Sequence, residues 1–222
     1  MPALNPLFVV VEGMEAVGKS TVVNYLKNHL TSISGLKTSI TREPGGTVLA
    51  EELRRIFKSD IMKDTSSLTQ AHLIAACRSD HLDRFIMPKL ASDNNVVCDR
   101  FLLSTLVYQG PFDFLLDLSQ RMIPDLTILL TSSKKNVIDR MMKRQHDVSK
   151  DWLDEAASDR HLVMQQKMLN LVQLDTNFEH SRNYLVVDTN QYEDVQSLHG
   201  GIGHDWELEN YFKGANETLC FI

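Results

Sequence analysis

The segment from Gly13 to Ser20 has the residue types and spacing of a phosphate-binding loop. Its sequence, GMEAVGKS, matches the pattern G-x-x-x-x-G-K-[ST] at every fixed position. In this pattern the glycines let successive backbone N–H groups point at one anion, the lysine contacts the β- and γ-phosphates, and the serine hydroxyl binds Mg²⁺. We therefore expect a nucleoside triphosphate to bind the residues of this loop: Gly13, Met14, Glu15, Ala16, Val17, Gly18, Lys19, Ser20 and Thr21.

The residues on either side of the loop support this interpretation. The apolar, β-branched run 8–11 precedes it, which is typical of a buried strand. Apolar residues at helical spacing follow it, at Val22, Val23, Leu26 and Leu30. The alternative is a strand-to-helix turn with an incidental lysine. It is disfavoured because every fixed position of the pattern matches and both flanking segments are of the expected kind.

A second set of charged residues indicates a metal and a second ligand. Asp99 follows the apolar run 96–98, so it lies at a predicted strand end, where a carboxylate can hold Mg²⁺ together with Ser20. Its alternative role is to cap the helix that follows. The planar guanidinium groups of Arg54, Arg78 and Arg100 suit phosphate oxygens. They suggest a phosphorylated acceptor opposite the triphosphate.

Strands and helices that could position these residues alternate along the chain. Apolar runs predict strands at 8–11, 37–41, 96–98, 126–130 and 184–187. Helical spacing predicts intervening helices, among them one over 68–85 that ends at Pro88 and one over 153–178. This alternation predicts an α/β fold with a five-stranded parallel sheet and helices on both faces. Because the strands end at one sheet edge, Glu15, Glu43, Asp99, Arg100 and Asp188 are expected to lie together there.

Composition restricts the other classes of function. The 222 residues carry a net charge of -6, which argues against a nucleic-acid-binding protein. No apolar run approaches the ~18 residues of a membrane span, and no basic residue precedes the first strand, so we expect neither a membrane anchor nor a signal peptide. Cys77, Cys98 and Cys220 are too widely spaced for a zinc site or a disulfide framework, which suits the cytoplasm. We interpret His72 and His81 as ordinary helix residues.

Longer motifs resemble the thymidylate kinases of bacterial type. After the phosphate-binding loop come TREPGGT at 41–47, EELR at 51–54, DRFLLSTLVYQG at 99–110 and PDLTILL at 124–130, in the family's order. The resemblance covers about residues 7–195. It implies a P-loop kinase fold with a single domain over 1–222, a short lid at about 143–154 and a C-terminal extension at about 200–222. It also implies a homodimer, ATP as donor, Mg²⁺ as cofactor and in-line transfer of the γ-phosphate to dTMP.

The resemblance also implies roles for individual residues. The catalytic residues would be Lys19, Arg100, Glu15 and Arg144. The acceptor would be bound by Glu15, Glu43, Pro44, Arg54, Arg78, Arg100, Ser104, Thr105, Tyr108 and Gln109. Among these, Arg54 and Arg100 would grip the acceptor phosphate, Arg78, Thr105 and Gln109 would contact the base, and Tyr108 would pack against the deoxyribose. From the sequence alone, Tyr108 could equally be a core aromatic at the end of a helix.

The predicted lid must supply a cation, because the four variable positions of the phosphate-binding loop are not basic. Arg144 is the first candidate and Lys150 the second, while Arg140 could stack on adenine or touch the triphosphate. The alternative interpretation is that this segment is only a solvated loop between two helices, which would explain its basic residues equally well. The chain departs from the family pattern at Trp152, which stands at the place of a lid arginine, and at Ile74, which replaces an aromatic residue that stacks on thymine.

Three other functions stay open at this point. The chain could phosphorylate dUMP, a 5-modified dUMP or another deoxynucleoside monophosphate. It could be a nucleotide switch, although DTNQ at 188–191 lacks the N-K-x-D pattern of guanine-specific switches. It could also be a catalytically weak nucleotide-binding homologue.

Overall fold

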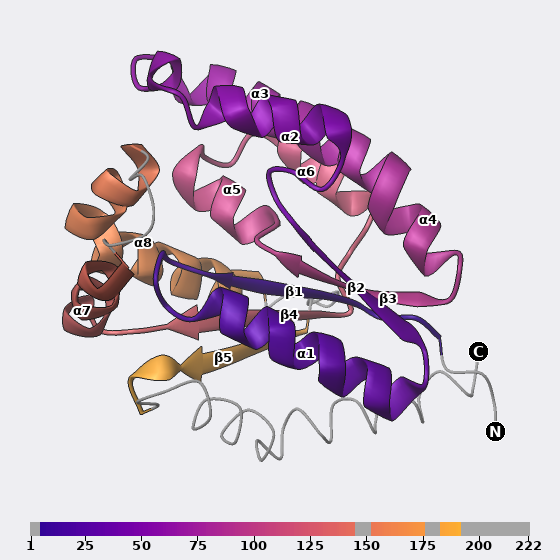
Figure 1. Cartoon of the computed structure of the whole chain (residues 1–222). Coiled ribbons are helices and arrows are strands. Elements are labelled where there is room, and N and C mark those ends of the chain that lie inside the picture. The colour runs from indigo at the N-terminus through magenta and orange to yellow at the C-terminus, as the bar shows by residue number, and fades with distance from the viewer. Residues whose placement is uncertain (1–4, 145–151, 176–182, 192–222) are drawn as a thin grey trace.

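Five parallel strands form a single sheet through the middle of the computed structural model (Figure 1). The structure describes residues 5–144, 152–175 and 183–191. The sheet order is β2-β3-β1-β4-β5. The strands are β1 (Phe8–Gly13), β2 (Lys37–Arg42), β3 (Asn94–Asp99), β4 (Leu126–Thr131) and β5 (Tyr184–Asp188). Each predicted strand is found, and the parallel five-stranded sheet is confirmed.

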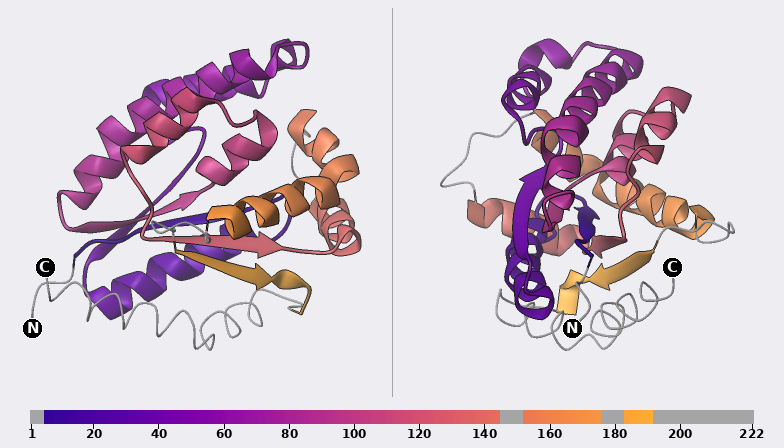
Figure 2. Two further views of the ribbon diagram at one scale, coloured as in Figure 1. Left: turned by 180° about the vertical axis from the view of Figure 1, so that it is seen from behind. Right: turned by 90° about the vertical axis from the view of Figure 1, so that its right-hand side faces the viewer.

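Helices cover the sheet on both sides. In Figure 1, α1 runs below the sheet, while α2, α3 and α6 lie above it, and α8 packs against α5 (Figure 2). The helices are α1 (Lys19–Ser34), α2 (Val48–Phe57), α3 (Ser67–His81), α4 (Met87–Leu90), α5 (Leu102–Tyr108), α6 (Asp113–Gln120), α7 (Lys134–Arg144) and α8 (Trp152–Asp175). Short 3₁₀ turns occupy Asp60–Met62 and Thr189–Gln191. Within the described residues, none of these helices has the length and apolar composition needed to cross a membrane.

Alternation along β1 divides the core between the two faces of the sheet. Val9 and Val11 join a buried cluster that includes Leu26 of α1. Phe8 and Val10 join a second cluster with residues from the segment after α3 and from α5. All four side chains are buried, because a central strand of a parallel sheet is covered on both faces. β1 is thereby fixed from both sides at the point where the phosphate-binding loop begins.

The helix predicted over 68–85 differs from the structure at its end. α3 stops at His81, a π turn follows at Leu82–Ile86, and α4 continues through Pro88 to Leu90. Proline lacks an N–H group, and its ring clashes with the carbonyl four residues earlier in a regular helix. The wider π turn just before Pro88 accommodates that ring, so Pro88 does not end the segment as predicted.

The buried amide of Asn95 ties three elements together at the amino-terminal end of the sheet. Its Oδ1 accepts a hydrogen bond from the backbone N–H of Leu7 at 2.9 Å. Its Nδ2 donates to Ser34 Oγ at 3.0 Å and to Thr38 Oγ1 at 3.2 Å. Asn95 therefore joins β3 to the start of β1, the end of α1 and β2.

We expect Asn95→Ala to lower the free energy of unfolding by about 2 kcal/mol, because it leaves buried polar groups without partners. Asn94→Ala is the matched control, since the bond from Asn94 Nδ2 to Ser92 O is exposed. The control should cost less than about 0.5 kcal/mol. Urea unfolding measures both, and equal losses would contradict the role assigned to Asn95.

Candidate active site

The phosphate-binding loop lies between β1 and α1, as predicted. Gly13 has φ +140°, and a Cβ there would lie 2.6 Å from the backbone oxygen of Leu130, so only glycine fits against β4. Gly18, with φ +104°, directly precedes the first turn of α1. Lys19 Nζ donates to the backbone oxygen of Met14 at 2.8 Å, so the loop wraps around its own lysine. Burial and the nearby Arg100 lower the pKa of Lys19.

A cavity of about 220 Å³ opens from this loop toward α2, α3 and α5. Arg54, Arg78 and Arg100 all line it together with Lys19 and Ser20, so the two predicted sets of residues border one cavity. Its charged lining is mainly basic and consists of Lys19, Arg42, Arg54, Lys58, Arg78, Arg100, Glu15, Glu43 and Asp99. The cavity therefore favours anionic ligands, although the chain as a whole is acidic.

Arg100 joins the phosphate-binding loop to α5. Its Nη2 forms an ion pair with Glu15, and its Nη1 donates to Ser104 Oγ at 2.9 Å. Burial opposes charge on both partners, but the attraction of Arg100 and Lys19 holds the pKa of Glu15 well below its usual value. For Arg100, burial acts to lower the pKa, but the combined attraction of Glu15, Tyr108, Asp99 and Glu12 raises it. Both groups are therefore charged near neutral pH.

The carboxylate of Glu12 holds the first turn of α5. Its Oε1 accepts from the backbone N–H groups of Phe101 at 2.8 Å and Ser104 at 3.2 Å. Its Oε2 accepts from Ser104 Oγ at 2.6 Å. Ser104 thus links Glu12 to Arg100. Glu12 is not among the residues predicted from the sequence, although an acidic residue directly before Gly13 in an apolar strand was a usable signal.

α5 and its C-cap Gln109 carry four of the ten predicted acceptor residues. Ser104, Thr105, Tyr108 and Gln109 all line the cavity. Tyr108 is half-buried and lies under the guanidinium of Arg100, with 5.7 Å from Arg100 Cζ to the ring centroid. Burial raises the pKa of Tyr108, so its phenol is neutral.

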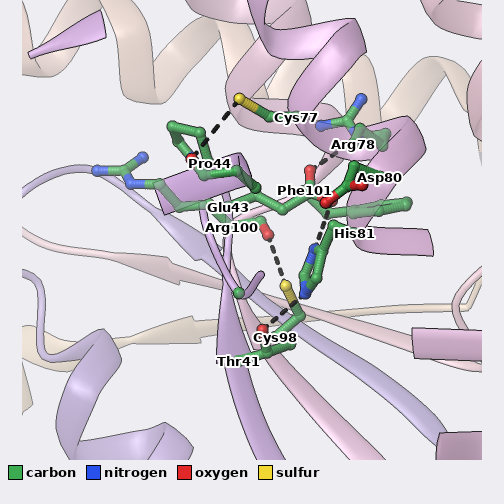
Figure 3. Close-up of polar contacts among 12 residues, drawn as sticks. Thr41, Glu43, Pro44, Cys77, Arg78, Asp80, His81, Cys98, Arg100 and Phe101 are labelled. Atoms are coloured by element: carbon green, nitrogen blue, oxygen red, sulfur yellow. Dashed lines mark hydrogen bonds and ion pairs between the residues drawn. The ribbon is translucent and has the colours of Figure 1, made fainter. Parts of the chain in front are cut away.

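The TREPGGT turn forms the opposite wall, and its bonds explain its composition (Figure 3). Glu43 Oε2 accepts from Arg78 Nε at 2.7 Å, and the backbone oxygen of Pro44 accepts from Arg54 Nη1 at 2.7 Å. Thr47 caps α2 by accepting from the backbone N–H of Ala50 at 3.1 Å. The turn therefore fixes two of the predicted acceptor-binding arginines.

Arg78 bridges this turn and α5. Besides its bond to Glu43, its Nη2 donates to Thr105 Oγ1 at 2.8 Å. Its Cζ lies 4.5 Å from the centroid of the Phe101 ring, a cation–π distance. The side chain is almost fully buried yet borders the cavity, so its orientation is set by these contacts.

His81 lies in α3, as expected, but it also belongs to a buried hydrogen-bond network. His81 is fully buried, with its Nδ1 3.1 Å from Glu43 Oε1 and its Nε2 2.6 Å from Thr41 Oγ1. The three-residue spacing from Arg78 places both side chains on one face of α3, which was a usable signal. His72, by contrast, is exposed and stacks on Phe114.

Five further residues line the cavity although they are not among the site residues predicted from the sequence. They are Arg42, Phe57, Lys58, Ile74 and Phe101. Arg42 and Phe101 directly neighbour predicted residues at strand ends. Asp188, which was expected at the same edge, instead accepts from the backbone N–H and the side chain of Asn190.

The residues around Ser20 and Asp99 fit a magnesium ion. Asp99 Oδ1 is buried without a hydrogen-bond partner, and both side chains border the cavity. Asp99 does not cap the following helix, because Phe101 occupies the N-cap of α5. The described residues contain no group of three or more His, Cys, Asp or Glu that could enclose a metal. Such a site suits Mg²⁺, which keeps waters and binds substrate phosphates.

Arg140 of α7 lies beside the phosphate-binding loop. Its Nη2 donates to the backbone oxygen of Thr189 at 3.0 Å, and its Nη1 lies 3.4 Å from the backbone oxygen of Ala16. Much of the predicted lid lies outside the described residues, including 145–151 and the side chains of Arg144 and Trp152. The predicted C-terminal extension at 200–222 also lies outside them.

Comparisons with known proteins agree with the resemblance seen in the sequence. The sequence pattern of the family described as Thymidylate kinase matches residues 11–198. The thymidylate kinase of Mycoplasma genitalium is 33% identical over 159 residues, 67% of this chain and 73% of the relative. That of Symbiobacterium thermophilum is 32% identical over 200 residues, 86% of this chain and 89% of the relative. The crystal structure of thymidylate kinase from Ehrlichia chaffeensis has a similar fold, with a TM-score of 0.65 and 22% identity over 90% of this chain and 97% of that one.

We expect Gly46→Ala to destabilise the protein strongly. Gly46 has φ +89°, and a Cβ there would lie 2.4 Å from His81 Nε2 and 2.5 Å from Thr41 Oγ1. The left-handed backbone costs alanine about 1–2 kcal/mol, and the clash should add about 1–3 kcal/mol. Urea unfolding measures the loss.

Gly35→Ala is the matched control, because Gly35 has φ +70° but a Cβ there would have no other atom within 4 Å. It should therefore show only the backbone cost of about 1–2 kcal/mol. If the two alanine variants unfold at the same urea concentration, the contact between Gly46 and His81 does not constrain the turn.

Proposed function

This chain belongs to the thymidylate kinase family of nucleoside monophosphate kinases, and we propose that it transfers the γ-phosphate of ATP to dTMP, forming dTDP. The observation that carries the proposal is the shared cavity, in which Arg54, Arg78 and Arg100 face the same space as Lys19 and Ser20. A hydrolase would need only the triphosphate half of this site. The second set of arginines supports a phosphorylated acceptor.

The acceptor phosphate would lie between Arg54 and Arg100. One of its oxygens attacks the γ-phosphorus, and the bond between that phosphorus and the bridging oxygen of the β-phosphate breaks. Because the attacking oxygen is already anionic, the reaction needs positioning and charge neutralisation rather than a strong base. Lys19 holds the donor phosphates, and Arg100 holds the acceptor in line with them.

Glu15 would orient the sugar of the acceptor. Its pKa lies well below the ordinary value, so near neutral pH it is a carboxylate that can only accept hydrogen bonds. In this proposal, the 3′-hydroxyl of the acceptor donates a hydrogen bond to the Glu15 carboxylate. Tyr108, which is neutral and borders the cavity, would pack against the deoxyribose.

The base would lie deeper, toward Arg78, Thr105 and Gln109. All three are buried polar side chains on the cavity wall, and Arg78 is already bonded to Thr105. Pro44 and Glu43 would close the wall formed by the turn. A base that leaves these buried donors without a hydrogen-bond partner would bind more weakly, so this end of the cavity can discriminate between bases.

ATP would bind on the other side, along the phosphate-binding loop, with Arg140 near its adenine or phosphates. Mg²⁺, when bound, would neutralise charge on the β- and γ-phosphates, and Ser20 and Asp99 would hold it, the latter directly or through water. We also propose that the enzyme acts as a cytoplasmic homodimer. The buried free thiols of Cys77 and Cys98 support a reducing compartment.

One observation favours a second candidate acceptor, a 5-modified dUMP. Ile74 lines the cavity one helical turn before Arg78, and its side chain is aliphatic. It provides apolar contact but loses the stacking energy of an aromatic ring, about 1 kcal/mol. The wall facing the base is therefore less specific for thymine than an aromatic wall.

A substrate panel tests the proposal. With ATP and Mg²⁺, we expect phosphorylation of dTMP to be the fastest reaction in a coupled assay with dTMP, dUMP, dCMP, dGMP and dAMP. A 5-bromo-dUMP arm tests the wall formed by Ile74. Faster turnover of dUMP or 5-bromo-dUMP would replace dTMP as the substrate, and no transfer to any monophosphate would reject the kinase function.

Arg144→Ala tests the source of the transition-state cation. We expect kcat to fall on the order of 10³-fold, because an arginine that stabilises the charge of the transferred phosphoryl group contributes about this much to the rate. The KM for ATP should change only modestly. Lys135→Ala is the matched control, because it removes one exposed positive charge from the first turn of the same helix, α7. Unchanged turnover in Arg144→Ala would exclude Arg144 as the source of the cation, and Lys150→Ala would then test the second candidate.

A further inference from the structure

A continuous series of buried side chains runs from Thr41, behind the cavity, to Thr105 in its wall. Thr41 contacts His81, His81 contacts Glu43, Glu43 pairs with Arg78, and Arg78 donates to Thr105. Figure 3 shows the first four of these side chains meeting between β2 and α3. The series crosses from the edge strand of the sheet to the helix that carries the acceptor residues.

We propose that His81, held by Thr41, is a positioning residue that sets the orientation of Arg78 and thereby the affinity for the acceptor base. The proposal rests on the proposed function, because it concerns the acceptor half of the same site. His81 does not border the cavity, whereas Glu43 and Arg78 do. Its effect on a ligand must therefore pass through Glu43.

The two oxygens of Glu43 have separate partners. Oε2 accepts from Arg78 Nε at 2.7 Å, and Oε1 lies 3.1 Å from His81 Nδ1. Because a carboxylate only accepts, His81 Nδ1 must carry the hydrogen. On the other side of the ring, Nε2 lies 2.6 Å from Thr41 Oγ1, a hydrogen-bond distance. The imidazole is thus fixed at both nitrogens.

This division of partners determines the orientation of the guanidinium. Arginine and a carboxylate prefer a bidentate pair with two parallel hydrogen bonds. While His81 occupies Oε1, Arg78 bonds Glu43 through Nε, and its Nη2 donates to Thr105. Without the His81 donor, Oε1 could take a second Arg78 nitrogen, and the guanidinium would turn away from Thr105.

Burial gives this small change a large effect. His81 is 0% exposed, Arg78 1% and Glu43 4%, so water cannot replace a lost partner. Space is also limited, because a Cβ at Gly46 would already lie 2.4 Å from the imidazole. The Phe85 ring, with its centroid 5.7 Å from that of His81, covers another side. The ring therefore has one position.

Two conservative variants separate the role of each ring nitrogen. The amide nitrogen of Asn can reach the place of Nδ1 and donate to Glu43, whereas that of Gln reaches the place of Nε2. We expect His81→Asn to keep the KM for dTMP within about threefold of wild type. His81→Gln should raise it about tenfold, the effect of one lost hydrogen bond to a charged group. In both variants, kcat and the KM for ATP should change less than about twofold, since the donor half is untouched.

Thr41→Val provides a milder variant that does not alter α3. It removes the hydroxyl that holds Nε2 of His81, and we expect a KM for dTMP between those of the wild type and His81→Gln. Combined with His81→Gln, it should add little, because both substitutions act through the same ring. Its isosteric side chain keeps the fold, so the proposal is tested even if the His81 variants do not fold.

His161→Asn is the matched control, because the amide nitrogen of Asn does not reach the place of Nε2. His161 is also buried, with its Nε2 3.0 Å from the backbone oxygen of Ser132, on α8. It should lower thermal stability without raising the KM for dTMP. An unchanged KM in His81→Gln and Thr41→Val would overturn the proposal. Equal rises in His81→Asn and His81→Gln, or a parallel rise in the KM for ATP, would show a purely structural role.

The experiment distinguishes this proposal from the proposed function. Wild-type protein that transfers phosphate to no monophosphate would reject the kinase function. If the wild-type protein is active but the His81→Gln and Thr41→Val variants keep the wild-type KM for dTMP, only the role of His81 is rejected. Calorimetry measures the binding of dTMP to the same proteins without turnover, and we expect weaker binding for His81→Gln and, to a lesser degree, for Thr41→Val, but not for the control variant.

Discussion

The hydrogen bonds of the Glu12 carboxylate fix the distance between the two halves of the site. Glu12 directly precedes Gly13, so it moves with the phosphate-binding loop. It accepts two backbone N–H groups and one hydroxyl from the first turn of α5. The N-cap residue of α5, Phe101, makes no side-chain cap bond, so Glu12 supplies the cap from another part of the chain. One fully satisfied buried carboxylate thus aligns the donor loop with the helix that carries the acceptor residues.

The TREPGGT turn constrains the site from the other side, where glycine and side-chain contacts depend on one another. Gly46 is needed because His81 and Thr41 occupy the space of a Cβ, and its backbone N–H donates to Glu51 at 3.0 Å. The same His81 holds Glu43, and Glu43 holds Arg78. A change at any of these positions is transmitted to the cavity wall through short, buried contacts rather than through the backbone alone.

The sequence was sufficient for every strand, the phosphate-binding loop and the arginines that share the cavity, because periodicity and motif spacing are local properties. The π turn before Pro88 was missed, because the prediction took the proline to end the helical segment and did not consider a wider turn that accommodates its ring. His81 and Glu12 looked like an ordinary helix residue and a break in a strand. Their roles arise from partners 38 to 92 residues away, and no window along the chain contains both ends of those bonds.

The two ends of the cavity differ in rigidity, and this difference suits the tasks that the proposed function gives them. At the end proposed for the base, Glu43 and Arg78 are almost completely buried and bonded on several sides. At the end proposed for the acceptor phosphate, the side chains of Arg100 and Glu15 are 15% and 31% exposed, and Arg100 has a left-handed backbone with φ +70°. Before a ligand binds, Glu15 offsets the charge of Arg100 and limits repulsion from Lys19. Under the proposed function, Arg100 would share its donors with an incoming acceptor phosphate and keep Ser104 as its anchor. Selection of the base would then fall to the rigid end, and the charge redistribution of phosphoryl transfer would occur where the side chains can adjust.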